Sequence, residues 1–266
     1  MKKVKNIVVL LAALSLSCVA AHAQFWDSAT GLLQCPSADM NRDGTFMITN
    51  NFMNEHSISS SYWGYHTFEY GFNINLWSRL EIGYVCVILD GKRKENPSSR
   101  DLIMFNQDRH ANFKLLLLKE GEFGIKWLPA LAIGLSDPTT GTGGDYTTQN
   151  VSGASNGFFN RNYIVATKHF TSKVGTIGAH LGYQYNRRTD FPMNGPCAAI
   201  DWTPVWLDSP AASVKLIAEY NSLTFNMGFI ASFWDDRIEA MFELMAMKWV
   251  NFGVRYKLQL KRIDNN

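Results

Sequence analysis

Long apolar runs are missing from the sequence beyond its first residues. After Ala23 no window approaches the roughly 18 consecutive apolar residues that a transmembrane helix needs, which excludes such a helix there. The net charge of +2 is small and no basic run occurs, so a nucleic-acid partner is not expected. The mean hydropathy of −0.12 resembles that of a soluble protein. Membrane barrels give the same low average, because apolar and polar residues alternate along their strands.

Cysteine is scarce and no CxxC motif occurs. Cys18 lies in the N-terminal apolar stretch, which leaves Cys35, Cys86 and Cys197 in the remainder of the chain. An odd count leaves at least one thiol without an intramolecular partner, and spacing alone does not choose a pair. The sequence therefore excludes a disulfide framework and leaves the disulfide state of these three residues open.

Motifs for enzymatic chemistry are also missing. There is no G-x-S-x-G, and the glycines of residues 141–144 lack the following lysine of a phosphate-binding loop. His66, His110 and His180 lie on different expected strands without short ligand spacing, so no metal site is expected. Outer-membrane acyl hydrolases use a lipid-facing Ser–His pair, whereas His180 is expected to face inward. These absences predict a protein without catalytic residues or cofactor, and not an enzyme.

The N-terminus carries the features of a secretory signal peptide. Three lysines occur among the first five residues, residues 7–16 are apolar, and an A-x-A motif ends at Ala23. Cleavage between Ala23 and Gln24 would remove residues 1–23 and leave 266 − 23 = 243 residues. A lipoprotein start at Cys18 is the alternative, but Ser15 stands where a lipobox prefers leucine.

Strict alternation of apolar and polar residues is the strongest feature of the C-terminal part. Residues 212–221, 223–233, 238–248 and 250–260 each hold this period of two for about ten residues. The last of these segments sets Val250, Phe252, Val254, Tyr256 and Leu258 against Asn251, Arg255, Lys257 and Gln259. Antiparallel strands with one apolar and one polar face, about 9–11 residues long, are typical of a membrane-spanning β-barrel.

Eight further segments upstream fit the same pattern. They cover residues 44–54, 65–76, 79–89, 107–119, 123–136, 158–170, 173–185 and 195–203. The total predicts an all-β, antiparallel transmembrane barrel of about twelve strands, an even number as bacterial barrels require. The barrel would span residues 44–260, with residues 24–43 as an N-terminal periplasmic segment or plug and residues 261–266 as a C-terminal tail.

The connections between these segments are sorted by length. The gaps after the first, third, fifth and seventh strands are long, at residues 55–64, 90–106, 137–157 and 186–194. Most gaps after even-numbered strands are short, and a tight turn is expected near Trp77 and Ser78. Long loops outside the cell and short periplasmic turns are the outer-membrane pattern. With an aromatic content of 13%, this predicts the outer membrane of a Gram-negative bacterium, with its lipid as a partner.

Charged and polar residues occupy the face expected to line the lumen. The candidate binding residues are Glu69, Arg79, Glu81, Asp108, His110, Lys114, Lys215, Glu219 and Arg255. Their mixed signs favour ion pairs that fill a narrow lumen. Contact with a sugar chain or its anionic groups is the alternative, and Lys215 and Glu219, on one strand face, are its first candidates.

Several short motifs lie in order along most of residues 30–260. They are Thr30-Gly31-Leu32-Leu33, Asp43-Gly44-Thr45, Asp108-Arg109, Leu118-Lys119-Glu120-Gly121, the run from Pro129 to Leu135, the run from Tyr163 to Lys168, and Ala218-Glu219-Tyr220. Together, these motifs resemble the YjbH-like family of outer-membrane proteins associated with exopolysaccharide production. The chain is shorter than the larger members, and it ends on Asn266 instead of a terminal aromatic residue.

The resemblance implies a process more than a mechanism. It predicts a barrel that acts in exopolysaccharide or capsule production or export, as a scaffold or export partner with no chemistry of its own. Polysaccharide and periplasmic export or assembly proteins are the implied partners. Two alternatives stay open: a structural or small-solute porin-like barrel, and a barrel enzyme that acts on lipid or glycan.

Overall fold

The computed structural model describes residues 27–57, 66–90, 104–138, 159–186 and 194–261. The expected signal peptide with Ala23 and Gln24, and most of each long loop, lie outside the described residues. So does the tail beyond Lys261. In the described part, no helix is long and apolar enough to cross a membrane.

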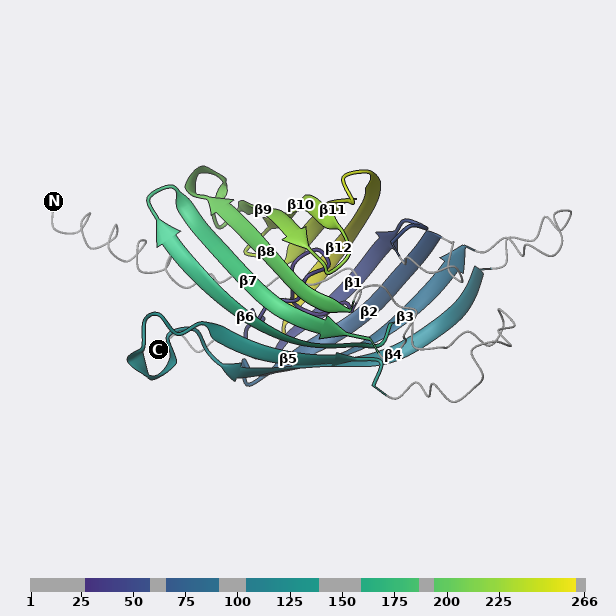
Figure 1. Cartoon of the computed structure of the whole chain (residues 1–266), viewed down its shortest axis with the longest axis horizontal. Coiled ribbons are helices and arrows are strands. Elements are labelled where there is room, and N and C mark those ends of the chain that lie inside the picture. The colour runs from purple at the N-terminus through teal and green to yellow at the C-terminus, as the bar shows by residue number, and fades with distance from the viewer. Residues whose placement is uncertain (1–26, 58–65, 91–103, 139–158, 187–193, 262–266) are drawn as a thin grey trace, which may run out of the picture.

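Twelve antiparallel strands form a closed barrel in which β1 pairs with both β2 and β12 (Figure 1). The strands are β1 (Thr45–Met53), β2 (His66–Leu76), β3 (Leu80–Asp90), β4 (Met104–Leu118), β5 (Ala130–Ser136), β6 (Arg161–Ser172), β7 (Gly175–Tyr185), β8 (Gly195–Pro204), β9 (Ala212–Tyr220), β10 (Phe225–Phe233), β11 (Ile238–Met245) and β12 (Trp249–Gln259). The barrel predicted from alternation is confirmed, and each of the twelve strands pairs with a neighbour on both sides over at least part of its length.

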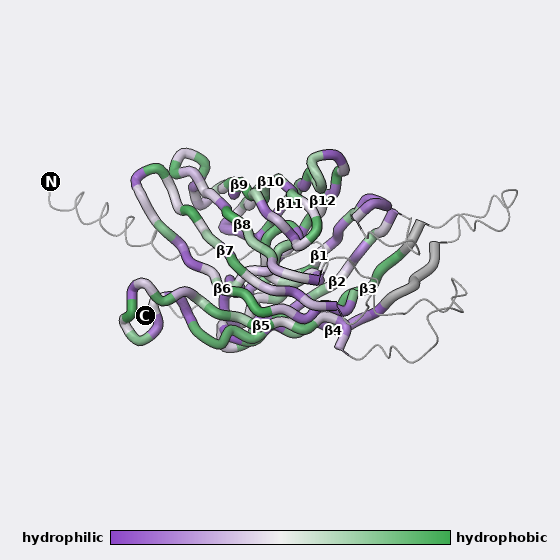
Figure 2. Tube along the Cα trace, viewed as in Figure 1, coloured by the Kyte–Doolittle hydropathy of each residue, from purple (hydrophilic) through white to green (hydrophobic). Residues whose placement is uncertain are grey.

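Alternation along each strand separates an apolar outer face from a polar interior. On β2, Phe68 and Phe72 are 40% and 45% exposed, whereas Glu69 and Asn73, which directly follow them, are 1% and 0% exposed. Hydrophobic and hydrophilic positions accordingly alternate along the strands in Figure 2. Large apolar side chains that face outward around a closed barrel are what a lipid environment requires.

The fifth strand is shorter than expected from the sequence. The segment 123–136 was expected to be extended, but β5 begins only at Ala130, and a 3₁₀ turn, η1 (Glu122–Gly124), precedes it. Gly121, Phe123 and Gly124 all have positive φ, which a β-strand does not allow. Ile125 therefore belongs to the connection before β5. It was assigned to a strand because it is apolar at a position that fits the alternating pattern.

The ends of the other strands lie close to their expected positions. A tight turn joins β2 to β3, with positive φ at Trp77 and Ser78 as two-residue hairpins require. Strand β11 ends at Met245 and not at residue 248, because Ala246 and Met247 form a turn of the same kind. The four long connections follow β1, β3, β5 and β7, so antiparallel order puts them at one end of the barrel.

Residues 27–41, the lumen segment hereafter, occupy the interior of the barrel. Every residue of this segment except Met40 is buried. Leu32, Leu33 and Cys35 form one apolar cluster with inward side chains of β1, β3 and β8 to β11. These side chains are Met53, Val85, Val87, Cys197, Ala199, Ile217, Ile230 and Met241, and Phe159, which precedes β6, joins the same cluster. The barrel thus has a packed core like that of a soluble protein, with the lumen segment at its centre.

Candidate functional site

A tight turn in the lumen segment is held by one carboxylate of the barrel wall. Gly31 and Pro36 form a bridge, and the Leu32 nitrogen donates to the Cys35 carbonyl over 3.1 Å. The amides inside this turn point to Glu219 on β9. Its carboxylate accepts from the backbone nitrogens of Leu33, Gln34 and Cys35 at 3.2, 2.7 and 3.1 Å. Converging donors of this kind offset the free energy of burying a carboxylate.

A second set of contacts holds both backbone polar groups of Thr30. The Thr30 nitrogen donates to Glu81 of β3 over 2.7 Å, and the Lys114 ammonium of β4 donates to the Thr30 carbonyl over 2.8 Å. The same ammonium donates to the Asp39 carbonyl. Asn73 supports Glu81 with a bond of 2.9 Å. Opposite charges on neighbouring strands therefore bind the two polar groups of one residue.

A third contact holds the beginning of the segment. The Ser28 hydroxyl donates to Glu69 of β2 over 2.6 Å, and Asn51 of β1 donates to the same carboxylate over 3.2 Å. Gly71 makes room for this contact, since a Cβ there would lie 3.0 Å from the Ser28 hydroxyl and 2.8 Å from the Tyr84 carbonyl. The beginning of the segment is thus fitted closely to β2.

Arg161, at the start of β6, also binds the lumen segment and was not among the residues predicted from the sequence. Its guanidinium donates to the Gln34 carbonyl over 2.5 Å and lies 3.6 Å from the Asp27 carboxylate. Gln184 of β7 orients it through a bond of 2.9 Å. The sequence could have indicated this role, because Arg161 occupies a position of the β6 alternation that faces the interior.

Other predicted lumen residues make contacts within the wall. Arg255 of β12 lies 3.3 Å from Glu239 of β11, and both side chains are fully buried. Lys215 does not meet Glu219, because its ammonium faces Asp201 of β8 at 3.6 Å. His110 is buried, and its ring stacks on Phe159 with centroids 5.2 Å apart.

Two predicted residues lie elsewhere or are described only in part. Arg79 is at the rim, in the turn before β3, where its guanidinium is half-exposed and pairs with Glu122. The Lys119 amide and this guanidinium hold the pKa of the Glu122 carboxyl below its usual range. The structure places the backbone of Asp108 in β4, opposite Val87, while its side chain lies outside the described part.

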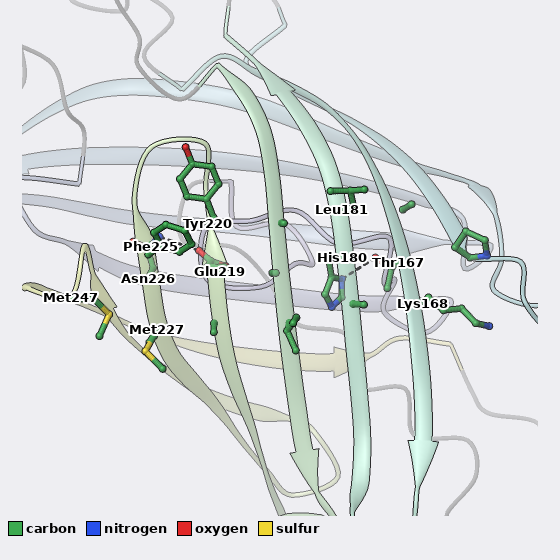
Figure 3. Close-up of a pocket in the computed structure, with 17 residues that line it drawn as sticks. Thr167, Lys168, His180, Leu181, Glu219, Tyr220, Phe225, Asn226, Met227 and Met247 are labelled. Carbon is green, nitrogen blue, oxygen red and sulfur yellow. Dashed lines mark hydrogen bonds between the residues drawn. The ribbon is translucent and has the colours of Figure 1, made fainter.

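A hollow of about 600 Å³ lies on the outer wall across β6 to β10. Its lining includes Leu181, Ile200 and Phe225, which are 66%, 61% and 70% exposed and so belong to the apolar outer face of the barrel. Figure 3 shows Leu181 on this side of β7, with its neighbour His180 hydrogen-bonded to Thr167. The lining also includes Thr167, His180 and Glu219, whose side chains are buried, so the hollow adjoins the wall residues that contact the lumen segment.

The solved structures that are similar to this chain include porins. The KdgM porin is 8% identical, with a TM-score of 0.46, and the match covers 82% of this chain and 99% of that chain. The KdgM porin in complex with disordered oligogalacturonate is 7% identical, with a TM-score of 0.45 and the same coverage. A triple mutant of the Rhodopseudomonas blastica porin is 10% identical, with a TM-score of 0.32, and 82% of this chain covers 75% of it.

No curated protein matches the chain. The family model YjbH, described as "Exopolysaccharide biosynthesis protein YbjH", matches residues 27–263, which include the whole lumen segment and all twelve strands. The chain belongs to the YjbH family.

Proposed function

We propose that this protein is an outer-membrane barrel that acts in exopolysaccharide production or export as a closed scaffold or export partner. The observation that carries the proposal is the occupation of the lumen by residues 27–41, held by Glu219, Glu81 and Lys114. Membership of the YjbH family supports the process. Residues 24–43 act in this proposal as the plug of a barrel domain 44–260, after removal of residues 1–23.

The orientation proposed for the barrel follows from its two ends. The long connections after β1, β3, β5 and β7 face the outside of the cell, and the chain enters β1 from the periplasmic end. Export or assembly proteins in the periplasm would meet the short turns at that end. Lipid of the outer membrane would surround the exposed apolar side chains, such as Phe68 and Phe72.

The charges of the lumen act in this proposal as structural groups and not as catalysts. Glu69, Glu81 and Glu219 accept hydrogen bonds from the lumen segment, which occupies the positions that a sugar chain would need. Contact of these residues with polysaccharide therefore requires displacement of the segment. A partner that draws the segment out would convert the closed barrel into an export path.

The proposal is tested in a deletion strain, with surface, secreted and periplasmic polysaccharide measured against the same strain carrying the intact gene. Leakage of a dye across the outer membrane is followed in parallel. We expect polysaccharide to be lost from the surface or retained in the periplasm, while the membrane stays tight. Unchanged polysaccharide in all three fractions would overturn the role in export and production.

A complementing gene for Glu219→Gln separates scaffold from conduit. If the segment must leave during export, loosening it should raise both export and dye leakage. If the barrel is a scaffold only, dye leakage should rise while export stays at the wild-type level.

A further inference from the structure

Two histidines and one carboxylate meet where the lumen segment reaches β6 and β7. Asp39 comes from the lumen segment, His169 from β6 and His180 from β7, and one ligand atom of each lies within 4.8 Å of the other two. The Nε2 atom of His169 is 3.6 Å from Oδ1 of Asp39. The two rings stand edge to face, with centroids 6.0 Å apart.

Each histidine is oriented by a second carboxylate on its other nitrogen. Nδ1 of His169 lies 2.8 Å from Glu120, and Nε2 of His180 lies 2.6 Å from Asp201 of β8. Gly178 makes the second contact possible, because a Cβ there would lie 2.1 Å from the Asp201 carboxylate. A carboxylate behind the ring is the usual arrangement of histidines that bind metals, since it fixes the tautomer and the ring orientation.

The second nitrogen of each ring faces a partner other than its orienting carboxylate. Nδ1 of His169 contacts Glu120, so Nε2 of His169 is the nitrogen that faces Asp39. Nε2 of His180 contacts Asp201, and Nδ1 of His180 lies 2.9 Å from the Thr167 hydroxyl, a contact drawn in Figure 3. The Ser37 hydroxyl donates to the other oxygen of Asp39 over 2.9 Å, which holds that carboxylate in place.

The charges around Asp39 and the two histidines leave room for a cation. Asp39, Glu120 and Asp201 bring three carboxylates, and the facing ammonium groups are Lys168, 2.9 Å from Glu120, and Lys215, 3.6 Å from Asp201. With neutral histidines the group carries a net charge of minus one. Neutral imidazole and carboxylate are the ligands that divalent transition metals prefer.

We propose that Asp39, His169 and His180 bind a divalent transition-metal ion, with Zn²⁺ the best fit, and that this ion fastens the lumen segment to the barrel wall. Ligand bonds of about 2.0–2.2 Å put tetrahedral ligand atoms about 3.3–3.6 Å apart. The 3.6 Å between His169 and Asp39 is close to that value, and rotation of side chains brings in His180. Ca²⁺ and Mg²⁺ fit less well, because they favour sites made of oxygen alone.

The proposal goes beyond a role in polysaccharide production and does not depend on it. One ligand comes from the lumen segment and two from the wall, so the ion binds only while the segment is in place. A ligand that binds one state raises the free energy of leaving that state by RT ln(1 + [L]/Kd). Removal of the metal should therefore loosen the segment without opening the barrel strands.

The test is titration of the untagged, chelator-treated full chain in detergent with Zn²⁺, followed by calorimetry. Co²⁺ is titrated in parallel, because its visible absorption reports the geometry of the ligands. We expect one equivalent of Zn²⁺ to bind, binding weakened at least 10-fold in Asp39→Asn and His169→Ala, and a tetrahedral Co²⁺ spectrum. Glu120→Gln, which keeps the three ligands, should weaken binding by about 10–100-fold.

The matched control is His110→Gln, which removes another buried histidine that stacks on Phe159. It should keep wild-type affinity. Asp39 and His169 are the tested ligands because His180 is deeply buried, and its loss would disturb folding through Asp201. Equal Zn²⁺ binding by wild type, Asp39→Asn and His169→Ala would overturn the proposal, as would absence of binding. In either case the group is an ion-pair network that joins the segment to the wall.

Discussion

The carboxylate of Glu219 lies 2.7 Å from the backbone nitrogen of Gln34, a residue 185 positions earlier in the chain. This bond joins β9 of the wall to the turn of the lumen segment. Together with the amides of Leu33 and Cys35, it explains why a carboxylate lies deep inside the barrel. The three amides replace the hydrogen bonds that water would donate to the carboxylate in solution.

Glu219→Gln tests this contact. The neutral amide weakens three charge-assisted bonds, and loss of about 1.5–3 kcal/mol should raise the population of the displaced segment about 10–100-fold. Labelling of Cys35 by a water-soluble maleimide, read by mass spectrometry of its peptide, should accelerate accordingly. Cys35 is a suitable reporter, since it is 1% exposed in the folded protein.

Glu239→Gln is the control, because the bonds of Glu239 to Arg255 and Lys257 stay within the wall. This variant should label at the wild-type rate. A Cys35 labelling rate in Glu219→Gln no higher than in this control would show that Glu219 does not hold the segment.

Leu33→Ala tests the apolar half of the same interface. Leu33 is fully buried, and a Cβ at Gly228 would lie 2.9 Å from its Cδ1 atom, so the wall is fitted to this side chain. Truncation should cost about 2–5 kcal/mol through lost transfer free energy and a residual cavity. We expect faster Cys35 labelling and an earlier first transition in urea. Leu181→Ala, at a 66% exposed site on the outer face of the barrel, should change neither quantity.

Arg255→Met separates the stability of the wall from that of the lumen segment. It leaves the buried Glu239 with Lys257 as its remaining cation, at 2.7 Å. Breaking a buried ion pair costs up to about 3–5 kcal/mol, so global unfolding in urea should begin at lower concentration. Cys35 labelling under native conditions should stay within a factor of about two of wild type. A large rise in labelling would tie Arg255 to the segment and contradict this assignment.

The ends of the barrel domain are joined by an ion pair with a defined pH dependence. The Lys261 ammonium lies 2.7 Å from the Asp43 carboxylate, and this bond, with the Trp77 amide, lowers the pKa of Asp43 below its ordinary 3.8. Because the pKa of Asp43 is lower in the folded protein than in the unfolded chain, the ionised carboxylate stabilises the fold at pH values above the ordinary pKa of 3.8. This contribution is lost as the pH falls through the pKa of the folded state.

Comparison with Asp43→Asn checks the sign. Wild type should unfold at a slightly higher temperature than this variant near neutral pH, and the two curves should merge in acid. The difference should be small, because the pair is exposed. A difference that persists unchanged in acid would exclude the carboxylate charge as its cause.

Much of the barrel could be predicted from the sequence because an apolar outer face and a polar interior impose a period of two. The expected segments 212–221 and 250–260 differ from β9 and β12 by three residues or fewer at each end. The predicted start of the strand at residue 123 was wrong for a local reason. Gly121 and Gly124 adopt positive φ, while Ile125 is an apolar residue at a position that fits the alternation of a strand.

The sequence predicted the wall residues of the site but not their partners. The alternation of polar and apolar residues predicted that Glu81, Lys114 and Glu219 face the interior, and all three are buried in the structure. Their partners are backbone groups of Thr30 and Gln34, which have no signature in residue type. His169 was missed because it is 11 residues from His180. Only the tight β6–β7 hairpin, which pairs His169 with Gly178, brings the two rings together.

Closure of the lumen by residues 27–41 is the central claim, and single-channel conductance in planar bilayers tests it most directly. Wild type is compared with a variant that lacks residues 27–41 and with Glu219→Gln, after each is shown to fold by its circular dichroism. We predict little steady conductance for wild type, brief openings for Glu219→Gln and a continuous open state for the deletion. Equal, steady conductance of wild type and the deletion variant would contradict the account.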